Sequence, residues 1–274
     1  MLYLVSTPIG NLGDISQRAK DILAQVDLVA CEDTRTSGNL FKLLGIQVKA
    51  TTPYHDHNAD SARPKLIQKL KKGINIALVS DAGTPLVSDP GYKLVRDCLK
   101  EGIKVSTAPG ANAVLSALQL SGLSSASFYF GGFLPTKSGA RKEHLKAVQN
   151  LKSTLIFYES PNRLLKALQD ILSVYGNREM AVVREITKKF EEVRKESVQS
   201  LIDYYTQNGE PKGELVLVID GTTETPQTQP IDWPRLIKTV RPKYPVKQAA
   251  ELLSEKTGVG KKEIYQIIIN NEKK

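Results

Sequence analysis

Two adjacent carboxylates, Glu32 and Asp33, directly follow a short apolar run, and Arg35 comes two residues later. A carboxylate that faces a cleft can take the proton of a hydroxyl group, and a nearby guanidinium can hold a phosphate or a carboxylate. The same carboxylates also serve as N-caps, because they accept the free N–H groups of a first helical turn. We therefore expect either catalytic carboxylates with Arg35 as partner, or a helix cap. Glu159, after a second apolar run, is a rival proton acceptor.

A long loop at 79–91 has the composition of a ligand site. It reads V-S-D-A-G-T-P-L-V-S-D-P-G, and it joins an apolar run, 74–79, to an amphipathic helical pattern, 90–99. Glycines let the backbone approach a ligand, prolines stiffen the turn, and open α/β sheets bind ligands beyond the carboxyl ends of their strands. A tight connection that binds nothing would need only about two residues. The loop therefore predicts a binding site at this strand end.

Several familiar motifs are missing from the sequence. The first apolar run is followed by Gly10-Asn11-Leu12-Gly13, which is not the G-x-G-x-x-G of dinucleotide-binding folds, and no P-loop or nucleophile elbow is present. His55 and His57 are two residues apart, without a third ligand nearby. We expect no metal site.

The periodicity of apolar residues predicts strands that alternate with helices on short loops. This order is typical of α/β units with parallel-rich sheets. The expected strands are 2–6, 27–31, 46–51, 74–79 and 103–107, then 127–130, 154–158, 180–184 and 215–219. The expected helices are 15–26 (capped by Asp14), 36–44, 62–72, 90–99 and 113–120, then a basic helix after Pro135, 164–174 and 198–205. We expect an N-terminal lobe at 1–121, a C-terminal lobe at 122–221, a linker at 222–231 and a basic module at 232–274.

The net charge indicates the kind of partner that the protein binds, and the cysteine content indicates its compartment. The chain has 274 residues and a net charge of +9, and its segment from Trp233 to Lys274 holds ten Lys or Arg against four Glu. This favours a polyanionic partner, nucleic acid above membrane, although a solvated basic face is the plainer alternative. Two helical patterns there, 246–256 and 261–270, fit a helix-turn-helix module or a hairpin that caps the main body. Two isolated cysteines, the absence of a signal-like start and the lack of a long apolar run indicate a cytoplasmic protein.

Eight motifs in order resemble one family. They are TPIGNLGD (7–14), CEDTR (31–35), the loop at 79–91, PG (109–110), GFLP (132–135), FYESP (157–161), REITK (184–188) and GELV (213–216). Each is weak alone, but the series is similar to the ribosomal RNA small subunit methyltransferase I family, within the tetrapyrrole-methylase class of S-adenosylmethionine enzymes. The resemblance covers 1–221, and the basic tail matches the family's C-terminal extension.

The resemblance implies two α/β/α lobes with S-adenosylmethionine in the cleft between them, and a homodimer. It also implies 2′-O-methylation of a cytidine in the decoding region of 16S ribosomal RNA. Its cofactor residues map onto this sequence at Pro8, Ile9, Gly10, Asp81, Ala82, Gly83, Thr84, Val87, Ser88, Asn112, Ala113, Tyr158 and Gly213. Thr84 stands where the wider class has an acidic residue, so Thr84 or Asp81 takes that polar role.

Contact with RNA is expected from basic side chains, because phosphate contacts set position without reading sequence. The candidates are Lys137, Arg141, Lys142, Lys188, Lys189, Lys261 and Lys262. Tyr54 or Phe133 is expected to stack on a splayed base, with core packing as the alternative, above all for Phe133.

Two other functions remain open from the sequence. One is a tetrapyrrole-ring methylase of the same fold, which has no need of a basic helical tail. The other is a non-enzymatic, ligand-sensing protein that binds DNA through the tail, for which Glu32 and Asp33 in the cleft have no purpose.

Overall fold

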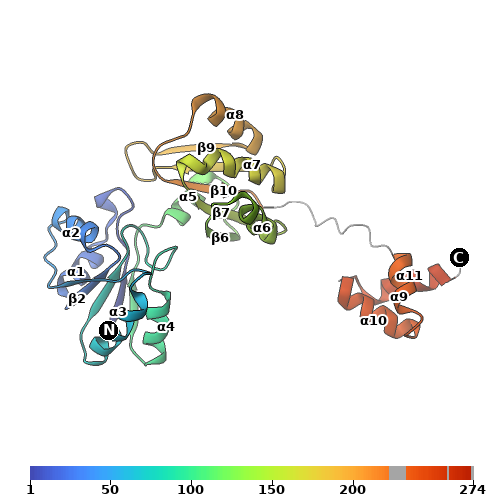
Figure 1. Cartoon of the computed structure of the whole chain (residues 1–274), viewed down its shortest axis with the longest axis horizontal. Helices are drawn as coiled ribbons and strands as arrows, with labels where there is room; N and C mark the ends of the chain where they lie inside the picture. Colours follow the sequence, from blue (N-terminus) through green and yellow to red (C-terminus); the bar gives the residue numbers. More distant parts are fainter. Residues whose placement is uncertain (222–232, 258, 273–274) are drawn as a thin grey trace. The chain divides into compact units, whose positions relative to one another are not determined.

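The computed structural model describes residues 1–221, 233–257 and 259–272. The chain divides into two compact units, Met1–Thr223 and Glu224–Lys274. The first unit contains two five-stranded sheets, which we call the first lobe and the second lobe (Figure 1).

The first lobe is built on a parallel sheet with the strand order β3-β2-β4-β1-β5. Its strands are β1 (Leu2–Val5), β2 (Leu28–Cys31), β3 (Thr51–Pro53), β4 (Ile76–Val79) and β5 (Val105–Ala108). Its helices are η1 (Leu12–Asp14), α1 (Gln17–Gln25), α2 (Thr34–Leu43), α3 (Ala59–Lys71) and α4 (Tyr92–Lys100). Because the sheet is parallel, the carboxyl ends of β2 and β4 lie beside each other at one edge.

Helices cover both faces of this sheet. Leu23 of α1 and Phe41 of α2 pack on one face, and Leu66 of α3 and Leu94 of α4 pack on the other. The central strand β4 is therefore buried on both sides, which explains its uninterrupted apolar run.

The second lobe is a mixed sheet with the strand order β6-β7-β10-β8-β9. Only β6 and β7 are parallel; the other neighbours are antiparallel. Its strands are β6 (Phe128–Phe133), β7 (Thr154–Glu159), β8 (Glu179–Arg184), β9 (Glu192–Ser197) and β10 (Leu215–Ile219). Its helices are α5 (Ala113–Ser121), α6 (Ser138–Val148), η2 (Pro161–Arg163), α7 (Leu164–Tyr175) and α8 (Val198–Asn208).

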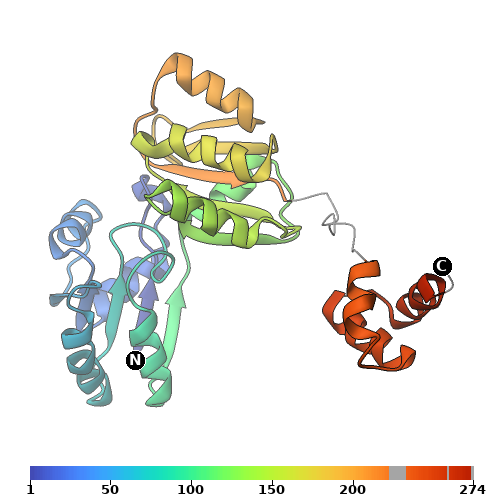
Figure 2. The same ribbon diagram turned by 45° about the vertical axis from the view of Figure 1, so that its right-hand side comes forward.

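Helix α5 follows β5 in the chain but packs on the second sheet. Val114 and Leu118 of α5 contact Ile156, Val183 and Val216, whereas α6, α7 and α8 cover the opposite face. Figure 2 shows the chain leaving β5 and passing directly into the second lobe. Because α5 packs on the second sheet, the boundary between the lobes lies before α5, and not after it at residue 121 as the sequence predicts.

Four local expectations differ from the structure. The third strand is Thr51–Pro53 rather than 46–51, and Ser16 rather than Asp14 caps α1. Strand β6 continues through Gly131 and Gly132 with a shift of register. The charged stretch before Ser197 contains an additional strand, β9.

The second unit contains three helices among its described residues: α9 (Trp233–Val240), α10 (Val246–Thr257) and α11 (Lys261–Glu272). Ile237, Ala249 and Leu253 pack with Ile264 and Ile268 in a core of their own. The two expected helices are confirmed as α10 and α11, and α9, which was not expected, supplies a third side of the core. The expected linker, 222–231, lies outside the described residues.

Both cysteines, Cys31 of β2 and Cys98 of α4, are buried and free. No helix in the described parts of the chain combines the length and apolar character needed to cross a bilayer.

Candidate functional site

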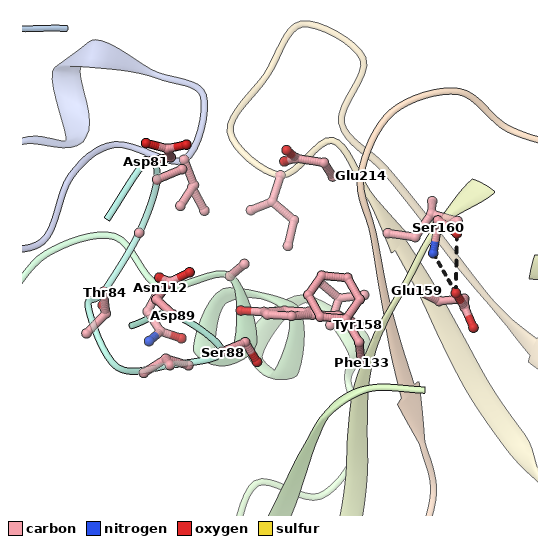
Figure 3. Close-up of a pocket in the computed structure, with 18 of the residues that line it drawn as sticks. Asp81, Thr84, Ser88, Asp89, Asn112, Phe133, Tyr158, Glu159, Ser160 and Glu214 are labelled. Atoms are coloured by element: carbon pink, nitrogen blue, oxygen red, sulfur yellow. Dashed lines mark hydrogen bonds between the residues drawn. The ribbon is translucent and has the colours of Figure 1, made fainter. Parts of the chain in front are cut away.

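A cavity of about 390 Å³ lies between the two lobes. Loops after β2, β4 and β5 line it from the first lobe, and β6, β7, β10 and the loop after β8 line it from the second (Figure 3). Its lining residues are Ile9, Glu32, Asp81, Ala82, Gly83, Thr84, Val87, Ser88, Asp89, Asn112, Ala113, Phe133, Tyr158, Glu159, Ser160, Pro161, Ile186, Gly213, Glu214, Leu215 and Val216.

Backbone and hydroxyl hydrogen bonds fix the loop after β4. Gly83 exchanges two backbone hydrogen bonds with Thr7, with N–O distances of 2.9 and 3.1 Å. Its φ of +82° is one that glycine adopts without strain. The hydroxyl of Thr84 donates to the carbonyl of Ala111 at 3.0 Å. Thr84 therefore ties this loop to the segment that leads into α5.

The next part of the loop contains two non-glycine residues with left-handed backbones, Leu86 (φ 74°) and Ser88 (φ 64°). Such conformations persist only where the surroundings enforce them, and they concentrate at functional sites. Leu86 packs against the core of the first lobe, and the next residue, Val87, packs against the core of the second. The loop is thus anchored in both lobes immediately before Asp89.

The predicted catalytic carboxylates have different roles in the structure. Glu32 lines the cavity, and one of its oxygens accepts the N–H of Asp81 at 3.3 Å. Asp33 caps α2 by accepting the N–H of Arg35 at 2.7 Å, and its other oxygen pairs with the Arg35 guanidinium at 2.9 Å. This contact lowers the pKa of Asp33 to about 2. Asp33 is therefore a helix cap, and Arg35, with 90% of its side chain exposed, is its partner outside the cavity.

Two carboxyl groups of the cavity are poised to hold protons more tightly than usual. Desolvation by burial raises the pKa of Glu32 and raises that of Asp89 to about 6. Desolvation, with a smaller contribution from Asp89, also raises the pKa of Tyr158 to about 12. The phenol of Tyr158 is thus a neutral hydrogen-bonding group near neutral pH.

Glu159 does not face the cavity with its carboxylate. Successive side chains of a strand point to opposite faces, and Tyr158 occupies the cavity face of β7. The Glu159 side chain, 0% exposed, pairs with Arg163 at 2.9 Å and accepts the N–H of Ser160 at 2.7 Å (Figure 3). This carboxylate joins the end of β7 to the start of α7, and the catalytic role expected for it stays a prediction that this geometry does not favour.

The structure brings most of the predicted cofactor residues together, although their role in binding stays a prediction. The exceptions are Pro8, which is buried next to Ile9, and Gly10, which is exposed and lies against the side chain of Lys188. Asn112 lines the cavity and also caps α5, because its side chain accepts the N–H of Leu115 at 3.1 Å. Among the described residues, no group of three or more His, Cys, Asp or Glu could hold a metal ion.

Some of the basic residues predicted to contact RNA form ion pairs within the protein, and others are exposed without one among the described residues. Arg141 is buried and pairs with Asp170 at 2.7 Å, so its predicted contact with phosphate is wrong. Lys142 lies 3.5 Å from the same carboxylate. Lys188 pairs with Glu185 and Glu214, and Lys261 pairs with Glu251. The exposed candidates that form no ion pair with any described residue are Lys137, Lys189 and Lys262.

The two residues predicted to stack on a base differ in burial, and in the opposite sense to the one expected. Tyr54 is 1% exposed and belongs to the first-lobe core. Phe133 is 60% exposed, lines the cavity, and lies edge-on to Tyr158 with 5.2 Å between ring centroids. Phe133 is therefore the aromatic ring available at the mouth of the site.

Sequence reasoning missed part of the cavity wall. The missed residues are Asp89, Ser160, Pro161, Ile186, Glu214, Leu215 and Val216. All seven lie inside motifs quoted above, so the motifs contained the signal.

Comparison with known proteins gives a consistent result. Residues 1–202 match the family model "Tetrapyrrole (Corrin/Porphyrin) Methylases". Ribosomal RNA small subunit methyltransferase I of Mesorhizobium japonicum is 46% identical over 98% of this chain and 91% of its own length. The protein of the same name from Vibrio cholerae is 46% identical over 99% of this chain and 95% of its own.

Solved structures share the fold at low sequence identity. Diphthine synthase has a TM-score of 0.61 at 16% identity, over 81% of this chain and 90% of its own. Uroporphyrin-III C-methyltransferase from Thermus thermophilus, solved with S-adenyl homocysteine, has a TM-score of 0.56 at 17% identity, over 80% of this chain and 96% of its own.

Proposed function

Because this chain belongs to the ribosomal RNA small subunit methyltransferase I family of tetrapyrrole methylases, we propose that it methylates small-subunit ribosomal RNA. The methyl donor is S-adenosylmethionine, and the acceptor is the ribose 2′-hydroxyl of a cytidine in the decoding region. The observation that carries this proposal is the 46% identity to relatives of that name over nearly the whole chain, tail included.

The cavity suits the methyl donor in size and chemistry. Its 390 Å³ lie within the range of small-molecule sites, about 300–1,000 Å³. Ile9, Val87 and Val216 offer apolar surface for an adenine ring, and the carboxylates of Asp81 and Glu32 complement a cationic sulfonium. Helix α5 begins at the cavity, where its dipole favours a carboxylate such as that of a methionine moiety.

Methyl transfer to a hydroxyl requires alignment and removal of a proton. The bound donor supplies an electrophilic methyl group. The fixed loop after β4 and the Tyr158–Phe133 wall hold donor and acceptor in line, and such positioning can supply about 7–11 kcal/mol of the barrier. Of the carboxylates predicted to take the proton, Glu32 lines the cavity, whereas Asp33 caps α2 and Glu159 is paired with Arg163.

The RNA is held from outside the cavity. We expect Lys137 and Lys189 of the second lobe and Lys262 of the second unit to contact phosphates, and Phe133 to stack on the target base or its neighbour. Lys189 lies over the ring of Phe190 at 5.6 Å, which adds a second exposed aromatic to this surface.

The alternatives differ in their support. Uroporphyrin-III C-methyltransferase shares the fold at 17% identity, which shows no common substrate. A ligand-sensing DNA-binding protein would also need a cavity, but the relatives that match nearly the whole chain are named as methyltransferases, which favours the enzyme. We also propose a homodimer, which light scattering during size-exclusion chromatography tests.

The deciding experiment is transfer of a labelled methyl group. Purified protein is incubated with S-adenosylmethionine and with small subunits from a strain that lacks the gene. Mapping of alkali-resistant ribose positions should locate one modified cytidine. Label on uroporphyrin rings, or no label on small subunits, would contradict the proposal.

A further inference from the structure

Five carboxylate-bearing residues line the cavity: Glu32, Asp81, Asp89, Glu159 and Glu214. Four of them already have a strong partner. Glu32 accepts the N–H of Asp81, and Asp81 accepts the N–H of Asp33 at 3.1 Å. Glu159 pairs with Arg163, and Glu214 pairs with Lys188 at 3.0 Å. A contact with a cation or a backbone N–H stabilises the charged form of a carboxylate and weakens it as a proton acceptor, although at Glu32 burial outweighs the one N–H contact and raises the pKa.

Asp89 differs from these four residues. Within the described chain, its carboxylate has no ion pair and no backbone N–H donor, and the nearby Ser80 hydroxyl donates instead to the carbonyl of Ala82 at 3.3 Å. Figure 3 places Asp89 beside Asn112 on one wall, with the hydroxyl of Tyr158 pointing toward them from the opposite lobe. The anchored backbone from Leu86 to Ser88 leads directly into Asp89. A free carboxylate on a rigid loop therefore faces a phenol across the space where substrate must lie.

We propose that Asp89 is the catalytic residue that takes the proton of the acceptor hydroxyl, and that Tyr158 positions this hydroxyl by a hydrogen bond. The inference rests on the proposed function. The acceptor oxygen bonds to the methyl carbon, the carbon–sulfur bond breaks with its electron pair on sulfur, and the hydroxyl proton passes to the Asp89 carboxylate. A cation and an anion thus become a neutral thioether and a neutral acid.

The groups that surround Asp89 are acidic or neutral. Glu32 at the end of β2, Asp81 at the end of β4 and Asp56 after β3 repel a negative charge on Asp89, and Tyr158 of β7 faces it. Burial, which is the largest cause, and these carboxylates raise the pKa of Asp89 to about 6, against a smaller opposing effect of the nearby Ser80 hydroxyl. A carboxyl with this pKa is largely ionised at neutral pH, yet it is a stronger base than an ordinary aspartate.

The first test is the single-turnover rate of methyl transfer to small subunits across a pH series with saturating S-adenosylmethionine. For the wild type, the rate should rise through about pH 6 and then level off, because only the ionised form accepts a proton. Asp89→Asn should lower the plateau by about 100- to 10,000-fold and remove the inflection. Asp89→Glu should restore part of the rate together with an inflection.

Asp56→Asn is the matched control, since it removes an equal charge outside the cavity. It should keep the plateau rate and move the inflection to lower pH. Tyr158→Phe should weaken acceptor binding and rate without removing the inflection, because it deletes only the positioning hydroxyl.

The second test does not depend on turnover. Calorimetry should show that Asp89→Asn binds S-adenosylmethionine within about threefold of the wild type. In the unliganded wild type, the carbon-13 signal of the Asp89 carboxyl, assigned by its absence from Asp89→Glu, should titrate near pH 6. This titration decides the matter if Asp89→Asn does not fold, because a midpoint below about pH 4.5 would refute the proposal.

Two further outcomes would overturn the assignment. One is an Asp89→Asn protein that keeps the wild-type rate and inflection. The other is a loss of rate that is matched by an equal loss of cofactor affinity while the inflection persists, which would make Asp89 a cofactor ligand. A wild-type protein that methylates no small subunits would instead count against the proposed function.

Discussion

A carboxyl group whose pKa is raised in the folded protein destabilises that fold once it ionises. Asp89, with a pKa raised to about 6 by burial, binds its proton more tightly in the folded chain than in the unfolded chain. Its unfavourable contribution is absent below about pH 4, develops between about pH 4 and 6, and is complete above that range. The ionised form of Asp89, which the proposed proton transfer needs, therefore lowers the free energy of unfolding.

Replacement of Asp89 by Asn should therefore stabilise the protein. We expect the free energy of unfolding to rise by about 1–2 kcal/mol at pH 7.5 and to change little at pH 4, because Asn resembles the protonated acid. Urea denaturation at the two pH values measures the difference. An equal change at both would mean that packing, rather than charge, sets the effect.

Gly83 should not tolerate a branched side chain. An added Cβ would lie 3.3 Å from the Ile9 side chain, on the cavity wall, and a φ of +82° is unfavourable for valine. Gly83→Val should weaken binding of S-adenosylmethionine by at least about tenfold and lower stability by about 1–2 kcal/mol. Gly45, with a φ of +66° and open space around it, provides the control: Gly45→Val should lower stability alone. Normal cofactor affinity in folded Gly83→Val would remove this loop from the site.

Among elements, the ion pair between Glu159 and Arg163 joins β7 to η2 and α7. Glu159→Gln should lower the free energy of unfolding by about 2–3 kcal/mol, since it leaves the Arg163 guanidinium without its anionic partner. The folded variant should keep its affinity for S-adenosylmethionine and its methyl-transfer rate. Thermal unfolding and single-turnover assays distinguish this from a catalytic role, in which stability would be retained and transfer lost.

Elements with a strong apolar signal were predictable from the sequence, and those without one were not. The runs at Ile76–Val79 and Leu215–Ile219 are buried on both faces, so they read as strands. Glu192–Ser197 forms an edge strand of charged residues, and its pairing with β8 depends on the neighbouring strand rather than on its own pattern. The short helix Trp233–Val240 gains its partners only from α10 and α11.

The sequence predicted which loops line the cavity, but it did not always predict which side chains point into it. The motif at 79–91 correctly located the cavity wall, because glycines, prolines and aspartates after a buried strand have few other uses. The direction of a side chain needs the register of its strand. Tyr158 and Glu159 are adjacent in one motif, yet they face opposite sides of β7. The same limitation applies to Arg141, whose partner Asp170 is on another helix.

For the molecule as a whole, the two compact units divide the work in a testable way. The residues of the cavity all lie within Met1–Thr223, and Glu224–Lys274 has a core of its own. A chain that ends at Thr223 should therefore bind S-adenosylmethionine with unchanged affinity. It should bind small subunits more weakly and with a flatter dependence on salt, by about one unit of slope per lost phosphate contact.

Calorimetry and salt-titrated binding of the truncated and full-length chains measure both effects. Lys262→Gln in the full-length chain is the finer comparison and should reduce the slope by about one. Unchanged affinity and slope after truncation would assign the second unit another task.

The burial of both native thiols makes the chain convenient for spectroscopy. Cys31 and Cys98 are enclosed, and burial raises the pKa of each to about 11, so the reactive thiolate is scarce at neutral pH. Maleimide dyes should therefore attach selectively to cysteines introduced at exposed positions outside the expected RNA contacts, such as Asn150 and Gln248. Energy transfer between two such dyes would report the distance between the second lobe and the second unit, with and without RNA. The chain would keep both of its native cysteines.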